Sequence, residues 1–264
     1  DEFKKALDLY MSPDGKIAKL EVVLAVNPYS REALETIDPL RDTVKQSLAG
    51  SAIRDADVKL TGTTAQFVEV DRLSSGDFRR TGLFVVIGIG IVLIVLLRSV
   101  AAPVYILLSL AFNYFVAMGL VEFTFVRLFG HPGLSWNTAF FVFLVLVALG
   151  VDYSIFLMAR FKEEYRQGEA VNAMKKAMAT TGSVIVSAAL IMGGTFATFL
   201  YSGVNTLVQI GTGVVIGLFL YTAVFMGLVV PAITMLFGEA NWWPFRRVRA
   251  VAAAEQPPHA VADG

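Results

Sequence analysis

The sequence predicts a membrane α-helical protein with five transmembrane helices, preceded by a small extracytoplasmic α+β subdomain. Hydrophobic residues make up 56% of the 264 residues, only 17% are charged, and the mean hydropathy is +0.64. This composition is too apolar for a soluble domain of that length. The charges are also segregated: most of the aspartate and glutamate precedes residue 77, and long uncharged runs follow.

The first part, residues 1–76, has the pattern of a soluble α+β subdomain. Ser30 is a typical helix N-cap, Gly50 a typical stop, and Pro39 between them predicts a kink. Residues rich in valine, isoleucine and leucine on either side of this helix predict two strands. In order, we expect a turn at 12–15, a strand over 16–28, a helix over 31–48, a strand over 57–61 and a helical lead over 63–78. About 75 residues are marginal for an independent fold, so we expect this subdomain to be partial and to pack on further sequence.

Residues 77–245 predict the membrane domain, because each apolar run approaches the ~20 residues that cross a ~30 Å hydrocarbon core. Ala177 to Gly238 is one uncharged run, too long for a single helix and suited to two spans joined by a turn at 201–205. The expected spans are about 81–97, 101–121, 136–159, 181–201 and 205–237. Residues 246–264 are polar and predict a disordered cytoplasmic tail.

The loops between these spans differ sharply in charge. Only Arg127 is basic in the loops 123–135 and 201–205. Basic residues favour the cytoplasmic side, which places residues 1–76 outside the cytoplasm and the C-terminus inside. Trp242 and Trp243, next to the last arginines, suit the aromatic belt at the membrane surface. The segments at the other ends of the spans carry nine basic residues: Arg98, Arg160, Lys162, Arg166, Lys175, Lys176, Arg246, Arg247 and Arg249.

Asp152 is the only charged residue between Pro132 and Ala159. A carboxylate at this depth must be protonated, paired or hydrated, and such residues commonly mark a proton or ion pathway. Tyr153 follows, rotated by about 100° on the helix, and its hydroxyl can donate to a carboxylate or accept from the acid. Ala148 and Gly150 thin the helix nearby, allowing close approach of another helix or water. The alternatives are an acid that only bonds a neighbouring helix and a tyrosine that only packs in the core.

Three other features have structural interpretations. Glu169–Thr180 has apolar residues on one side and Lys175-Lys176 on the other, which predicts an amphipathic helix at the membrane surface. Gly213 and Gly217 form a small-xxx-small pattern, typical of close helix contact. Gly193-Gly194 indicates either packing or a flexible point.

Several classes of chemistry are excluded or disfavoured. The chain has no cysteine, and its two histidines, His131 and His259, lie in a turn and in the tail, so we expect no metal site and no cofactor. The net charge is zero, which gives no indication of nucleic-acid binding. No phosphate-binding loop or zinc-hydrolase motif occurs. An intramembrane aspartyl protease would need a second deep acid, and Glu122 lies at a span's edge. We therefore expect no enzyme.

The residues around Asp152 resemble a known family. Gly150-Val-Asp-Tyr153, with the segment running to Gly168, is similar to the signature of the MMPL group of the resistance–nodulation–division (RND) transporters. Leu60–Asp71 and Asn241-Trp-Trp-Pro244 resemble the same group, so the resemblance covers residues ~15–247. Members resemble two fused repeats, each with an external porter domain and a set of spans. The sequence begins at Asp1 without methionine, so we expect a piece of a longer protein. The resemblance implies a C-terminal half fragment, with the end of the second porter domain and the last five spans of the second repeat.

This resemblance implies an exporter of lipids or other hydrophobic compounds in the bacterial plasma membrane, driven by the proton-motive force. It implies that Asp152 and Tyr153 are one of two facing pairs that relay protons, accompanied by a serine on the next span. Ser187 matches that serine best, and Ser183 is the second candidate. The implied partners are the bilayer, the N-terminal repeat or a homologous half, and the hydrophobic substrate. The alternative is a non-transporting module of the same superfamily, of the sterol-sensing or protein-translocation-assisting kind.

Overall fold

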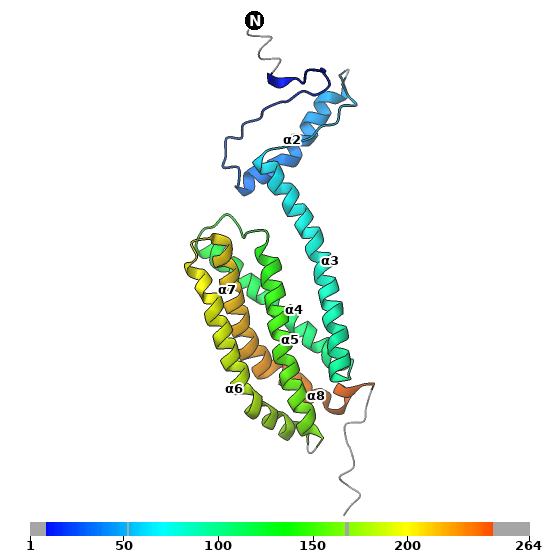
Figure 1. Ribbon diagram of the computed structural model, residues 1–264, viewed down its shortest axis with the longest axis vertical. Helices are drawn as coiled ribbons and strands as arrows, with labels where there is room; N and C mark the ends of the chain where they lie inside the picture. Colours follow the sequence, from blue (N-terminus) through cyan, green and yellow to red (C-terminus); the bar gives the residue numbers. More distant parts are fainter. Residues whose placement is uncertain (1–8, 52, 167–168, 245–264) are drawn as a thin grey trace, which may run out of the picture. The chain divides into compact units, whose positions relative to one another are not determined.

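The computed structural model of the protein describes residues 9–51, 53–166 and 169–244 (Figure 1). The chain divides into two compact units, with the boundary between Arg72 and Leu73. The described residues are mostly helical and contain no β-strand. In chain order the elements are α2 (Arg31–Ala49), α3 (Thr63–Leu97), α4 (Ala101–Glu122), the π-helix η1 (Phe123–Leu128), α5 (Thr138–Tyr165), α6 (Ala170–Ala197), the 3₁₀ helix η2 (Thr198–Tyr201), α7 (Asn205–Leu220), the π-helix η3 (Tyr221–Val229), α8 (Val230–Phe237) and the 3₁₀ helix η4 (Gly238–Trp242).

Five helical runs of the described chain are long and apolar enough to cross a membrane. This confirms the membrane α-helical fold class that the uncharged runs predict. The helices form because a backbone in hydrocarbon must satisfy its own hydrogen bonds. The runs are Thr63–Leu97, Ala101–Leu128, Thr138–Tyr165, Ala170–Tyr201 and Asn205–Trp242.

The first unit contains α2, whose ends follow the local sequence signals. The Ala33 backbone N–H donates to Ser30 Oγ at 3.2 Å, and the Gly50 N–H donates to the Leu48 carbonyl. These contacts satisfy groups that a helix end leaves free. Ala33 and Ile37 are the buried residues of this helix.

The predicted α+β character of the first unit is wrong for the described residues. Residues 16–28 and 57–61 form no strand, and the described part of this region has only an isolated bridge between Met11 and Ala18. A strand requires a continued ladder of backbone hydrogen bonds to a neighbouring strand, and in the described chain the pairing of these residues stops at the one bridge that Ala18 makes. Their apolar side chains consequently stay in the open, and Val23 is 89% exposed.

Two helical segments predicted to precede a span are continuous with that span. The lead over 63–78 and the first span form the single helix α3, which is 35 residues long. The segment 169–180 and the fourth span likewise form α6, which is 28 residues long. No glycine or proline interrupts either junction at 78–81 or 180–181, so the backbone has no local reason to leave the helical conformation.

The core of the second unit lies where α5 and α7 meet. A Cβ placed on Gly213 would lie 2.8 Å from Val142, and one on Gly217 would overlap the Leu146 side chain. Both glycines therefore let α7 approach α5 closely, as the small-xxx-small pattern predicts. Helix α7 also contacts α4 and α6, and α5 contacts both of them, so these four helices form one bundle (Figure 1).

Trp242 lies inside this bundle, which corrects its assignment to an aromatic belt. It is 1% exposed, and its ring stacks on Phe161 with centroids 6.2 Å apart, whereas Trp243 is 55% exposed. Lys162 Nζ lies 4.8 Å from the Trp242 ring centroid and donates to the Leu97 carbonyl at 2.5 Å. The belt interpretation failed because an indole buried by neighbouring side chains has the same sequence context as one at the lipid surface.

The residues around Trp242 join three parts of the chain. Ser99 Oγ, in the turn between α3 and α4, donates to the Asn241 carbonyl, and the Val100 N–H donates to the Trp243 carbonyl at 2.9 Å. We call this group the Trp242 clamp. It consists of Ser99, Phe161, Lys162, Asn241 and Trp242, and it links the end of α3, the end of α5 and η4.

Candidate functional site

Helix α5 carries the candidate site and has two distinct faces. One face is buried in the bundle and belongs to the apolar core, with Val142, Leu146 and Leu157 among its residues. The other face is uncovered by the described chain. Its exposed residues recur at spacings of three, four and seven, as expected for one side of a helix. They are Phe141, Ala148, Asp152, Phe156 and Ala159.

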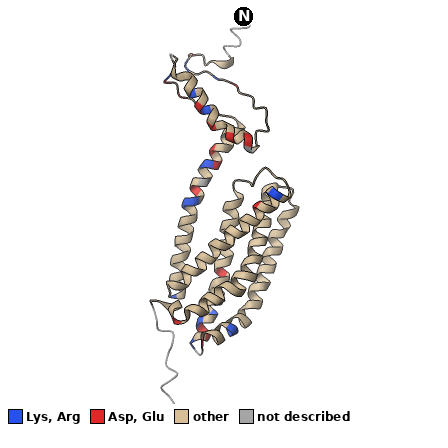
Figure 2. Cartoon of the chain, turned by 180° about the vertical axis from the view of Figure 1, so that it is seen from behind, with Lys and Arg blue, Asp and Glu red and all other residues tan. Residues whose placement is uncertain are grey.

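Asp152 is on this uncovered face, in the middle of an otherwise uncharged run. Among the described residues, no hydrogen bond or ion pair holds its carboxylate. Figure 2 shows that the other charged residues lie in the first unit, along the first half of α3 and near the ends of the other helices. A carboxylate at membrane depth requires a proton, a polar partner or water. On the uncovered face of α5, the Asp152 carboxylate is accessible to a proton, a polar partner or water.

Tyr153 points the other way. It is 7% exposed, its ring belongs to the core, and its hydroxyl is buried with no hydrogen-bond partner in the described chain. Core packing therefore accounts for the ring but not for the hydroxyl. An unpaired buried hydroxyl costs about 1–3 kcal/mol. Asp152 and Tyr153 are thus adjacent in sequence but reach different surroundings, as their rotation on the helix predicts.

Ser154, the next residue, forms a polar contact that the sequence does not reveal. Its Oγ donates to the Gly150 carbonyl at 2.7 Å and lies 2.6 Å from the Tyr221 hydroxyl. Ser154 and Tyr221 are both buried, and 67 positions separate them. Hydroxyls within apolar runs are the only signal available, and nothing in the sequence indicates which two of them meet.

Gly150 makes room for that contact. A Cβ on Gly150 would overlap Leu110 Cδ2 and would lie 3.2 Å from Tyr221 Cε1. The elements admitted by this glycine are therefore α4 and η3 of the same bundle. Ala148, by contrast, is exposed and lies on the face of Asp152. The two small residues predicted beside the acid thus act on opposite sides of α5.

The predicted serine of the relay, Ser187, is exposed on α6, as is Ser183. Helices α5 and α6 are in contact along the bundle. No hydrogen bond joins either serine to Asp152 among the described residues. Both serines are therefore accessible in the part of the chain that the structure describes.

No group of three or more histidine, cysteine, aspartate or glutamate residues that could hold a metal ion occurs in the part of the chain that the structure describes. The candidate site therefore consists of one carboxylate and neighbouring hydroxyls. Such groups accept, donate and transfer protons.

Comparison with known proteins identifies the family. The sequence model of the MMPL family matches residues 2–257, which is almost the whole chain. The chain belongs to the MMPL family. This confirms the resemblance that the Gly-Val-Asp-Tyr motif ending at Tyr153 indicates.

Individual MMPL relatives are similar over nearly all of the chain. The putative membrane protein YdgH of Bacillus subtilis is 44% identical over 246 residues, which cover 93% of the chain and 28% of that protein. The sulfolipid-1 exporter MmpL8 of Mycobacterium tuberculosis is 32% identical over 92% of the chain and 22% of its own length. The probable transport protein MmpL12 of the same species is 29% identical over 92% of the chain and 21% of its own length. The chain thus spans less than a third of each of these relatives.

Proposed function

We propose that this chain is a fragment of the C-terminal half of a proton-motive-force-driven exporter of lipids or other hydrophobic compounds. The observation that carries the proposal is Asp152, a lone carboxylate at membrane depth on a face that the described chain leaves uncovered. Membership in the MMPL family supports a transporter rather than an enzyme. The name of MmpL8, a sulfolipid-1 exporter, supports a lipid or lipid-like substrate.

In this proposal Asp152 loads and releases the proton. Tyr153 and Ser187 supply hydroxyls that pass the proton on or stabilise one of its two states. The unpaired Tyr153 hydroxyl supports that role, because it is free to bond water or a group that enters during transport. Ser187 supports it by remaining exposed on the helix beside α5.

The partner in this proposal is the N-terminal repeat or another homologous half. Its acid–tyrosine pair would face the stripe of α5 that includes Ala148, Asp152 and Phe156. Exposure of this stripe is consistent with a surface that a second set of helices covers. We further propose that the membrane is the bacterial plasma membrane, with residues 1–76 outside and the C-terminus in the cytoplasm.

The test is Asp152→Asn in the native protein, reconstituted in vesicles under a proton gradient. The amide keeps the shape of the side chain but cannot carry a proton. We expect proton-coupled transport to fall at least tenfold, with an unchanged thermal unfolding midpoint. Tyr153→Phe should reduce transport less, since only one hydroxyl is lost. The matched control is Asp42→Asn, the same chemical change at an exposed position of α2.

Proton flux and substrate flux are both followed, the first with a pH-sensitive dye. Transport by Asp152→Asn at the wild-type rate would show that Asp152 is structural and would overturn the relay. Loss of transport in Asp42→Asn as well would show that the change acts through general damage to the protein. A native protein that moves neither protons nor substrate would favour a non-transporting module.

A further inference from the structure

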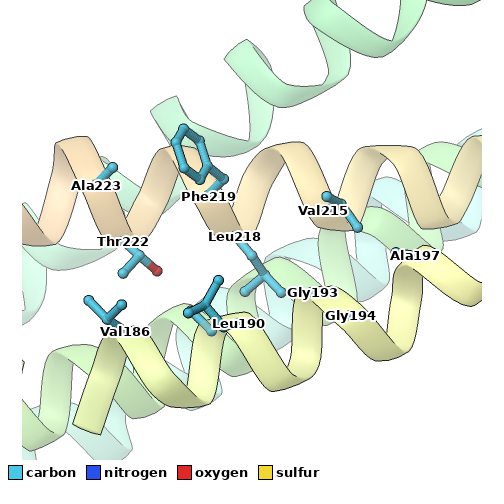
Figure 3. Close-up of a pocket in the computed structure, with 11 residues that line it drawn as sticks. Val186, Leu190, Gly193, Gly194, Ala197, Val215, Leu218, Phe219, Thr222 and Ala223 are labelled. Atoms are coloured by element: carbon cyan, nitrogen blue, oxygen red, sulfur yellow. The ribbon is translucent and has the colours of Figure 1, made fainter. Parts of the chain in front are cut away.

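A groove separates α6 from α7 and the beginning of η3. It encloses about 480 Å³ (Figure 3), within the range of about 300–1,000 Å³ found for ligand sites in proteins. Every residue of its wall is apolar or glycine except Thr222. The wall consists of Val186, Ala189, Leu190, Gly193, Gly194 and Ala197 from α6, with Val215, Leu218, Phe219, Thr222 and Ala223 from the facing helix.

Gly193 and Gly194 create the space on the α6 side. A Cβ built on either glycine meets no atom within 4 Å, although the same construction at Gly211 gives a contact of 2.7 Å and at Gly213 one of 2.8 Å. The pair therefore does not serve helix packing in the described chain. It removes side chains from the wall and leaves room for something else.

The groove is apolar in its chemistry. Thr222 provides its one hydroxyl, and this oxygen is buried and has no hydrogen-bond partner in the described chain. Thr181 and Thr234, by contrast, each donate to the carbonyl four residues earlier at 2.7 Å. Because the Thr222 oxygen is covered, a molecule in the groove meets mainly hydrocarbon.

The depth of the groove limits what fills it. All of its lining residues belong to the uncharged run from Ala177 to Gly238, so the groove lies within the hydrocarbon region. Water needs two to four polar partners, and the lining offers only the buried Thr222 hydroxyl, which disfavours water as the occupant. The surrounding medium consists of acyl chains, and an apolar groove open to that medium suits a linear hydrocarbon.

We propose that this groove is a binding site for one acyl chain of a bilayer phospholipid. The site is separate from Asp152: its α6 residues lie on the side of that helix that faces α7, and no residue of α5 lines it. The proposal does not rest on proton coupling or on any transported substrate.

The test uses the native protein in vesicles whose phosphatidylcholine carries a photoactivatable diazirine midway along one acyl chain. After irradiation, adducts are mapped by peptide mass spectrometry. We expect adducts at Ala189, Ala197 and Val215, which line the groove and are half-buried, to be at least fivefold more frequent than on the exposed apolar face of α3. Leu83 and Val95, 59% and 70% exposed, represent that ordinary lipid-facing surface. Equal labelling of the groove and this surface would overturn the proposal.

Leucine variants test whether the labelling depends on the space in the groove. Gly193→Leu fills the groove and should reduce its labelling at least fivefold. Gly182→Leu is the matched control, since Gly182 is on the same helix, also has no atom within 4 Å of a built Cβ, and does not line the groove. Ala197→Leu, at the other end of the groove, is the second filling variant if Gly193→Leu fails to fold. Equal labelling in filling and control variants would contradict the proposal.

Two further outcomes would also overturn it. Thr222→Val keeps the shape of the side chain and should leave labelling unchanged, because the hydroxyl is covered. Loss of labelling in this variant would indicate a ligand held by a polar group rather than by its acyl chain. Cysteines at Leu190 and Phe219 that cross-link to another polypeptide in high yield would show that a protein segment covers the groove.

Discussion

At Gly211, α7 approaches the end of α6 very closely. A Cβ at this position would lie 2.7 Å from the Phe196 carbonyl oxygen and 2.8 Å from Phe199 Cβ. Real Cβ atoms essentially never come closer than 3.0 Å, so Gly211→Ala requires a shift of at least 0.3 Å. The oxygen cannot simply turn aside, because it accepts a hydrogen bond from the Thr198 N–H at the end of α6.

The expected cost follows from two opposing effects. Overpacking a well-packed core costs about 1–3 kcal/mol. Replacing glycine by alanine in a helix recovers about 0.5–1 kcal/mol. The difference between the two ranges is about 0–2.5 kcal/mol, so Gly211→Ala should destabilise the bundle by up to about 2.5 kcal/mol. Gly182→Ala, where the new methyl group meets no atom within 4 Å, should stabilise it by about 0.5–1 kcal/mol.

Equilibrium unfolding in detergent micelles, followed by circular dichroism, measures both variants against the unchanged protein. The two midpoints should move in opposite directions. Shifts of the same sign and size would refute the reasoning, because they would show that glycine's backbone freedom, rather than the contact with Phe196, determines the effect of both substitutions.

Two other predictions concern the clamp and the topology. Trp242→Ala should lower the free energy of unfolding by about 3–5 kcal/mol, since the indole is 1% exposed and its loss leaves a cavity beneath Lys162; an unchanged midpoint in the same unfolding assay would contradict this. Because the chain contains no cysteine, single cysteines report topology without background. Cysteines at Ser12 and Ser202 should react with an impermeant thiol reagent in intact cells, and one at Lys175 only after the membrane is opened; labelling of the Lys175 site in intact cells would reverse the proposed orientation.

Features fixed by neighbouring residues could be predicted from the sequence. Ser30 and Gly50 cap α2 through contacts within three residues, and an uncharged run long enough to span a membrane becomes a helix because its backbone bonds are internal. The position of Asp152 on α5 follows from helix periodicity alone. Its exposure does not, since the same spacing fits a buried face.

Features that depend on distant partners could not be predicted. The strand expected over 16–28 needs a neighbouring strand, and the contact between Ser154 and Tyr221 joins positions 67 apart. Glycines illustrate the limit most clearly. Gly193 and Gly213 have similar apolar neighbours in sequence, yet one faces open space and the other meets Val142. Only the three-dimensional arrangement separates a glycine that packs from one that leaves a groove.

The Trp242 clamp has a consequence for the order in which the bundle is made. Ser99 and its acceptor Asn241 are 142 positions apart. At about 5–20 residues per second, a ribosome needs roughly 7–30 s to pass from one to the other. During that interval α4 and α5 are synthesised after α3, but Ser99 has no Asn241 carbonyl to bond and Lys162 has no indole beneath it. Completion of the clamp therefore awaits the synthesis of η4.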